Sequence, residues 1–166
     1  MKSLPIVAAL TLALAAVVFV ASSAGAYGLS GIGGRMGAVD PDHADGAVTV
    51  GGHLELEESG SRVHLQPGVL FWSTNGLSDV NPNFDVMYHF ARAGRVGPYV
   101  GGGAGMHFYS FDVPGPNDTK TDLGANLFGG VLIPSSSLRF FVEGRYVATD
   151  RSQTMITGGV TMPLHH

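Results

Sequence analysis

The 166-residue sequence has no cysteine, few charged residues and, after its first 26 residues, no long apolar run. Without cysteine, a disulfide framework and a cysteine-based metal site are both excluded. Charged residues make up 13% of the chain, whereas a water-soluble domain usually carries about 25%. The formal net charge is −4 and there is no basic run, so nothing indicates a nucleic-acid partner. The length is sufficient for a single domain.

Residues 1–26 have the pattern of a secretory signal peptide. Residues 1–3 form a short positive region, residues 4–20 are apolar, and residues 24–26 are a small-residue A-x-A cleavage site. We expect cleavage before Tyr27, which leaves residues 27–166 as the mature domain, whose single lysine is Lys120. The alternative is a retained membrane anchor, because the apolar run is long for a signal peptide.

After Tyr27 the chain divides into segments in which apolar and polar residues alternate, separated by turn residues. The segments cover residues 29–39, 47–57, 62–74, 80–91, 98–111, 122–133, 138–147 and 153–164. Alternation places successive side chains on opposite faces of a strand, and regular spacing of short strands is typical of a sandwich or barrel. Pro67 lies inside the third segment and predicts a bulge or a missing ladder bond there.

Residues 138–147 show the division between the two faces most clearly. Phe140 and Val142 share one face, whereas Glu143 and Arg145 share the other. A lipocalin-like secreted barrel would bury the apolar face, and a membrane barrel would bury the polar face. A β-sandwich is a further alternative.

The polar face is mostly glycine, histidine, threonine and scattered charges, which suits a narrow lumen better than a solvated surface. The glycine rows 31/33/37 and 101/103/105 leave room where large side chains cross the interior. In hydrocarbon, a closed sheet satisfies every backbone polar group. We therefore predict an all-β protein, an eight-stranded antiparallel up-and-down transmembrane β-barrel.

The sequence also resembles a known family. The resemblance rests on the signal peptide, GGH at 51–53, PYVGGGAGMHFYSFD at 98–112, TDLGANLFGGV at 121–131, RFFVEGRYV at 139–147 and TGGVTM at 157–162. These motifs are similar to those of small outer-membrane β-barrels of the OmpX/OmpA-like, porin-family superfamily. The chain departs from the family at its last residues, His165 and His166, where an aromatic residue is usual.

This resemblance implies a bacterial outer-membrane location after signal-peptide-dependent export. It implies outer-membrane lipid and lipopolysaccharide as surroundings, the barrel-assembly machinery as a partner during insertion, and a monomeric barrel. Members of the family share an architecture and not an activity, so the resemblance names no ligand.

The candidate site residues are the polar side chains expected to face the lumen: Arg35, His53, Glu55, His64, Asp85, His89, His107, Asp122, Asn126, Glu143 and Arg145. Buried charges persist only when they are paired and hydrogen-bonded, so we expect a network that holds the barrel rigid. The alternative is a path for ions or small solutes, which the small interior of eight strands disfavours.

Other chemistry has weaker support in the sequence. The four inward histidines lie on different strands without a recognisable metal-ligand spacing, and DPDHADG at 40–46 lacks the full calcium-loop pattern. His107 and Ser110 are expected on opposite faces of one strand, so they cannot form a nucleophile–base pair, and no G-x-S-x-G occurs. We expect no enzymatic activity, no metal and no cofactor.

The expected function is that of a membrane platform with a side-chain-filled polar lumen. It would present loops 39–46, 74–79, 112–121 and 148–152 to the outside, where an extracellular ligand could bind, while the connections at the opposite end are short. The alternatives are a narrow pore or small-ligand-binding barrel, a lipid-modifying enzyme and a secreted lipocalin-like binder.

Overall fold

The structure is a computed structural model that describes residues 27–91, 94–111 and 119–164. The expected signal peptide of residues 1–26, most of the expected loop at 112–121 and the C-terminal residues His165 and His166 lie outside these ranges. Export of the chain and the domain boundary at Tyr27 therefore stay predictions.

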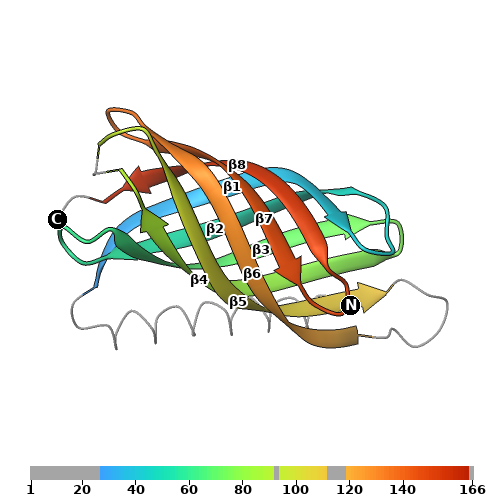
Figure 1. Cartoon of the computed structure of the whole chain (residues 1–166). Helices are drawn as coiled ribbons and strands as arrows, with labels where there is room; N and C mark the ends of the chain where they lie inside the picture. Colours follow the sequence, from blue (N-terminus) through green and yellow to red (C-terminus); the bar gives the residue numbers. More distant parts are fainter. Residues whose placement is uncertain (1–26, 92–93, 112–118, 165–166) are drawn as a thin grey trace.

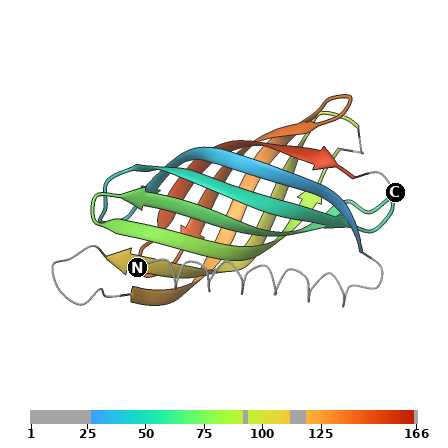
Figure 2. The same ribbon diagram turned by 180° about the vertical axis from the view of Figure 1, so that it is seen from behind.

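Eight strands form one closed antiparallel barrel, which confirms the predicted fold class. Each strand pairs with the next along the chain, and β1 pairs with β8 to close the sheet. Figures 1 and 2 show the strands running obliquely around the barrel, with β8 beside β1. The strands are β1 (Gly28–Pro41), β2 (Ala47–Glu57), β3 (Val63–Thr74), β4 (Leu77–His89), β5 (Gly97–Phe111), β6 (Thr119–Pro134), β7 (Arg139–Ala148) and β8 (Gln153–Pro163).

The outer face of the barrel is apolar and the inner face is largely polar. Leu123 is 74% exposed and Ile156 is 66% exposed, whereas Asp79 and His107 are 0% exposed. A barrel with this orientation is stable in a lipid bilayer, where closure of the sheet pairs its backbone groups and the apolar side chains contact acyl chains. The lipocalin-like alternative required the opposite orientation. Within the described ranges, no helix is long and apolar enough to cross a membrane.

Two prolines interrupt the hydrogen-bond ladders. The β2–β3 ladder lacks pairs around Pro67, and the β4–β5 ladder lacks pairs around Pro82. The register is the same on both sides of each gap, so ladder bonds are missing without an inserted residue. This confirms the expected missing bond at Pro67 and follows from the absent N–H of proline. A true register shift occurs in β1, between Leu29 and Gly31.

The connections differ from the prediction in length. Asn75 and Gly76 alone connect β3 to β4, with Gly76 at φ 78°, so residues 77–79 belong to β4 and not to a loop. Asn-Gly is the preferred sequence of such two-residue hairpins. Likewise, residues 119–121 belong to β6. The prediction of a loop at 74–79 was therefore wrong.

The two ends of the barrel have connections of similar length, which corrects the expected asymmetry. We call the end that carries the described connections 42–46, 75–76 and 149–152 the loop end. The turn end carries the described residues 58–62, 90–91, 94–96 and 135–138, together with the start of β1 and the end of β8. Residues 39–41, 77–79 and 119–121, which were expected in loops, belong to strands.

The interior also contains apolar side chains beside the polar ones. One cluster lies toward the loop end and comprises Val39, Leu70, Trp72, Leu77, Tyr109, Val147 and Met155. A second cluster comprises Met87, Tyr99, Phe128 and Phe141. The polar interior residues are therefore held among apolar side chains, where unpaired charges are costly.

Candidate functional site in the barrel interior

Ion pairs cross the interior between strands that are not neighbours in the sheet. Arg35 Nη1 on β1 donates to Glu143 Oε1 on β7 at 2.9 Å. Arg145 Nη1 on β7 lies 2.7 Å from Asp85 Oδ2 on β4, and Arg145 Nε donates to Glu143 Oε1 at 3.0 Å. All four side chains are buried. Two guanidinium groups and two carboxylates thus form a balanced central network that links β1, β4 and β7.

Neutral side chains supply further bonds to this central network. Arg35 Nη2 donates to the side-chain oxygen of Gln66, and the Tyr99 hydroxyl donates to Glu143 Oε2 at 3.0 Å. Asn126 Nδ2 donates to Asp85 Oδ1 at 3.0 Å. Hydrogen bonds of this kind are what allow buried charges to persist.

Aromatic rings and glycines complete the packing around the guanidinium groups. The Arg145 guanidinium lies 4.3 Å from the ring centroid of Phe128, within the range of a cation–π contact. A Cβ atom at Gly101 would lie 2.4 Å from Phe128 Cζ, and one at Gly103 would lie 2.3 Å from Asp85 Oδ1. The glycine rows therefore make room for large side chains on neighbouring strands, as the sequence predicted.

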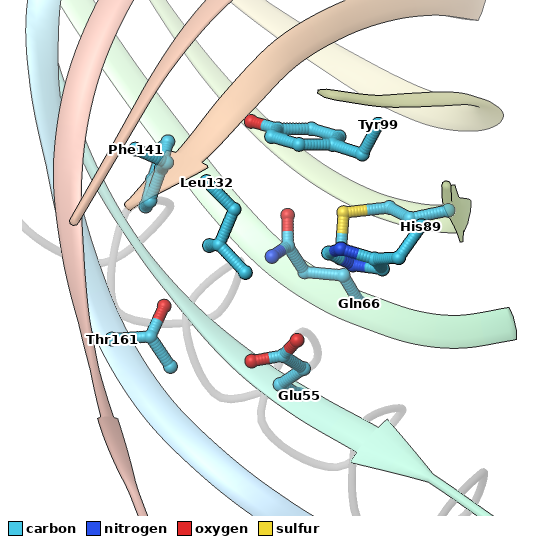
Figure 3. A pocket seen from close by; sticks show the side chains of 8 residues that line it. Glu55, Gln66, His89, Tyr99, Leu132, Phe141 and Thr161 are labelled. Carbon is cyan, nitrogen blue, oxygen red and sulfur yellow. The ribbon is translucent and has the colours of Figure 1, made fainter. Parts of the chain in front are cut away.

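A second polar group lies toward the turn end and contains two of the four inward histidines. Glu55 Oε1 lies 2.7 Å from His64 Nδ1, and Glu55 Oε2 accepts from Arg139 Nη2 at 2.7 Å. The rings of His64 and His89 are 4.3 Å apart between centroids, and His89 stacks on Tyr99 at 5.4 Å. Figure 3 shows Glu55, His89 and Tyr99 around one cavity. Its volume of about 10 Å³ is room for about one water molecule.

A third polar group lies toward the loop end. His107 Nδ1 lies 2.7 Å from Asp79 Oδ2, and both side chains are fully buried. Gln153 Nε2 donates to Asp79 Oδ2 at 3.3 Å and to the Tyr109 hydroxyl at 3.0 Å, and Trp72 Nε1 donates to Gln153 Oε1 at 3.2 Å. This group joins strands β3, β4, β5 and β8 beneath the loop end.

The structure separates the residues that the sequence placed in one row. His53 Nε2 lies 2.9 Å from Thr161 Oγ1, which lines the same cavity as Glu55, whereas His107 belongs to the loop-end group. Asp122 differs most from the expectation: it is partly exposed, and its Oδ2 accepts from the backbone N–H of Asp150 at 3.1 Å. By alternation Asp122 lies on the inner face of β6, but it is partly exposed because it is close to the loop end, where the lumen opens.

Several interior polar residues were missed from the sequence. Asp79 is absent from the predicted residues because it falls in the predicted loop of residues 74–79. Had Asn75-Gly76 been recognised as a complete hairpin, Asp79 would have fallen in phase with Asp85 on β4. Gln66, Tyr99 and Gln153 are inward by alternation, but nothing in the sequence marks them as partners of Arg35, Glu143 and Asp79.

The exposed rim of the loop end carries a different kind of ion pair. Lys120 Nζ lies 2.6 Å from Asp150 Oδ2, and both side chains are exposed. This contact holds the pKa of the Asp150 carboxyl below its usual value. The pair ties the start of β6 to the β7–β8 connection without contributing to the interior.

The geometry on β5 matches the expectation for His107 and Ser110. His107 is fully buried in the interior, whereas Ser110 is exposed. Their side chains therefore lie on opposite faces of the sheet, and Ser110 is not placed to give its proton to His107.

Comparisons with known proteins support the fold. No protein-family model matches the sequence, and no curated protein matches it. Among solved structures, the barrel is similar to neisserial surface protein A, NspA, with a TM-score of 0.71 and 11% identity, covering 83% of this chain and 99% of that one. It is similar to the N-terminal β-barrel domain of Pseudomonas aeruginosa OprF, with a TM-score of 0.67 and 15% identity over 82% and 99% of the two chains.

A third similar structure is Ail, the attachment invasion locus protein of Yersinia pestis. The TM-score is 0.57 at 12% identity, covering 84% of this chain and 99% of that one. At such identities the likeness shows the fold alone. The predicted resemblance to small eight-stranded outer-membrane barrels is confirmed at that level.

Proposed function

We propose that the protein is a closed structural barrel of the bacterial outer membrane, exported by the signal peptide of residues 1–26. In this proposal it is a monomer surrounded by outer-membrane lipid and lipopolysaccharide, and the barrel-assembly machinery inserts it. The apolar outer face of the barrel and its likeness to three barrels of bacterial proteins support this location. The loop end faces outside and forms the platform.

The central network of Arg35, Asp85, Glu143 and Arg145 is the observation that supports a barrel without an open path. Its ion pairs run across the lumen between β1, β4 and β7, and each side chain is also held by a neutral or aromatic partner. A solute path along the axis would require these buried pairs to separate. Buried charges are stable only while they stay paired and hydrogen-bonded, so the network favours a scaffold over a pore.

Planar-bilayer recording tests the closed state. The purified barrel is expected to give no stepwise conductance, whereas steps in the unmodified protein would support the pore alternative. The sample is first checked for heat-modifiable gel mobility, so that a silent recording reports a folded barrel.

Cysteine labelling of intact cells tests location and orientation, because the natural chain contains no cysteine. The variant Asp45→Cys places a thiol at the exposed loop end, and Ser136→Cys places one at the exposed turn end. A membrane-impermeant maleimide is expected to label only Asp45→Cys in intact cells and both variants in lysed cells. Labelling of Ser136→Cys alone would reverse the proposed orientation.

The loop end also offers a surface for a second candidate function, recognition of a polar ligand. An open depression of about 610 Å³ is lined by residues that include His43, Asp45, Asn75, Phe111 and Arg151, and ligand pockets commonly span about 300–1,000 Å³. The Arg151 guanidinium lies 5.4 Å from the Phe111 ring centroid. If a ligand binds here, binding to intact cells should weaken in Arg151→Ala and stay unchanged in Ser136→Ala at the other end.

A further inference from the structure

We propose that Glu55, His64 and His89 form a binding site for a divalent transition-metal ion, with Zn²⁺ the best match, at the turn end of the lumen. One carboxylate and two imidazoles are also the donors of catalytic zinc sites, which leave a position open for water. No metal-ligand spacing is visible in the sequence, because the three residues lie on different strands, β2, β3 and β4.

The three side chains converge inside the lumen. One ligand atom from each of them lies within 4.8 Å of the other two, and all three residues are buried. Zinc–ligand bonds of about 2.0–2.2 Å require the ligand atoms to lie closer than about 4.4 Å. Binding therefore needs a small inward rotation of the side chains, while consecutive paired strands keep their backbones in place.

An unsatisfied nitrogen marks the same place. His89 is 8% exposed, and its Nε2 has no hydrogen-bond partner among the described residues. A buried polar atom without a partner is costly, and each such case in a native protein requires an explanation. A metal ion held with Glu55 and His64 would supply the missing partner, and the adjoining cavity has room for one bound water.

Neighbouring groups orient the carboxylate and offer access. Arg139 occupies Oε2 of Glu55, and Oε1 shares a hydrogen bond with His64 Nδ1, so a metal ion bound by these two atoms would displace the proton between them. Such outer partners fix the geometry of metal-binding carboxylates. Glu57 Oε2 lies 3.4 Å from His64 Nδ1, and the Glu57 side chain is 37% exposed. Glu57 thus connects the site to solvent at the turn end and adds a second carboxylate that offsets the charge of Arg139.

Isothermal titration of the folded full chain with Zn²⁺ tests the proposal. All samples carry His165→Ala and His166→Ala, because those histidines would compete for the ion. We expect one ion per barrel, with affinity lowered at least tenfold in His89→Gln and in Glu55→Gln. His53→Gln is the matched control: it removes a buried inward histidine that is bonded to Thr161 and should leave binding unchanged.

Cobalt absorption provides a measurement that does not depend on a variant folding. Co²⁺ added to the background protein should give visible bands of a low-coordinate nitrogen and oxygen site, which one equivalent of Zn²⁺ removes. The proposal is overturned if no such bands and no stoichiometric heat appear, or if folded His89→Gln binds Zn²⁺ as tightly as His53→Gln does.

Discussion

Arg145 Nη1 lies 2.7 Å from Asp85 Oδ2, so the seventh and fourth strands are joined by an ion pair through the middle of the barrel. Both side chains are almost fully buried. A charge pair in this position contributes little if both partners are replaced together, but loss of one partner leaves an uncompensated charge in a low-dielectric interior.

The first prediction follows from that asymmetry. Arg145→Met should lower the free energy of unfolding by about 3–5 kcal/mol, because it leaves Asp85 and Glu143 without their shared cation. The measurement is urea unfolding in lipid vesicles. Arg151→Met, which changes an arginine of the β7–β8 connection, should change stability by no more than about 0.5 kcal/mol. If the two substitutions lowered the free energy of unfolding equally, the central network would not explain the stability of the barrel.

The second prediction concerns glycines of the inner face. Gly103→Ala should destabilise the barrel by about 1–3 kcal/mol, because the new Cβ would lie 2.3 Å from both Asp85 Oδ1 and the backbone oxygen of Phe84. Gly144→Ala is the matched control, since a Cβ there meets nothing within 4 Å. Gly144→Ala should be neutral or slightly stabilising. The unfolding midpoints of the two variants in detergent test this predicted difference in stability.

The third prediction tests which face meets lipid. Val142 is 56% exposed on the outer face of β7, so Val142→Arg should cost about 2–4 kcal/mol if this position is near the bilayer midplane. Thr154→Arg, at the exposed start of β8 near the loop end, should cost about 0–1 kcal/mol. Folding equilibria in vesicles measure both. A harmless Val142→Arg would contradict the membrane orientation.

The fourth prediction concerns the two-residue hairpin. Gly76 has φ 78°, a conformation that costs a residue with a Cβ about 1–2 kcal/mol. Gly76→Val should therefore destabilise the barrel by roughly that amount. Ser136→Val, in an exposed turn at the opposite end, is the comparison. If Gly76→Val unfolds at the same urea concentration as the unmodified protein, the tight hairpin is not formed.

The fifth prediction is a pH dependence at the loop end. The pKa of Asp150 is lowered by the hydrogen bond from Lys120, so the pair stabilises the fold above the ordinary pKa of aspartate. This stabilisation is lost as the pH falls through the lowered pKa of Asp150. Carbon-13 NMR titration should show the Asp150 pKa rising toward its ordinary value in Lys120→Met. An unchanged midpoint would show that the ion pair is absent in solution.

The strands and their faces were predictable because alternation is a local property. Phe140 and Val142 against Glu143 and Arg145 assign the two faces of β7 without knowledge of any other strand, and the glycines at 101 and 103 indicated where large neighbours pass. Charged residues make up only 13% of the chain, which indicated that the polar face of the strands is the inner face of the barrel. These features needed only the sequence and the period of a strand.

The partners of the interior residues were decided by closure of the barrel. Arg35 and Glu143 are 108 positions apart and meet only because β1 pairs with β8 in one particular register. Glu55, His64 and His89 converge through the registers of the β2–β3 and β3–β4 pairs, and the two-residue turn at Asn75-Gly76 brings Asp79 inside. Alternation gives the side of the sheet on which a residue lies. Its height along the axis depends on strand register and turn length, which the whole ring of strands sets together.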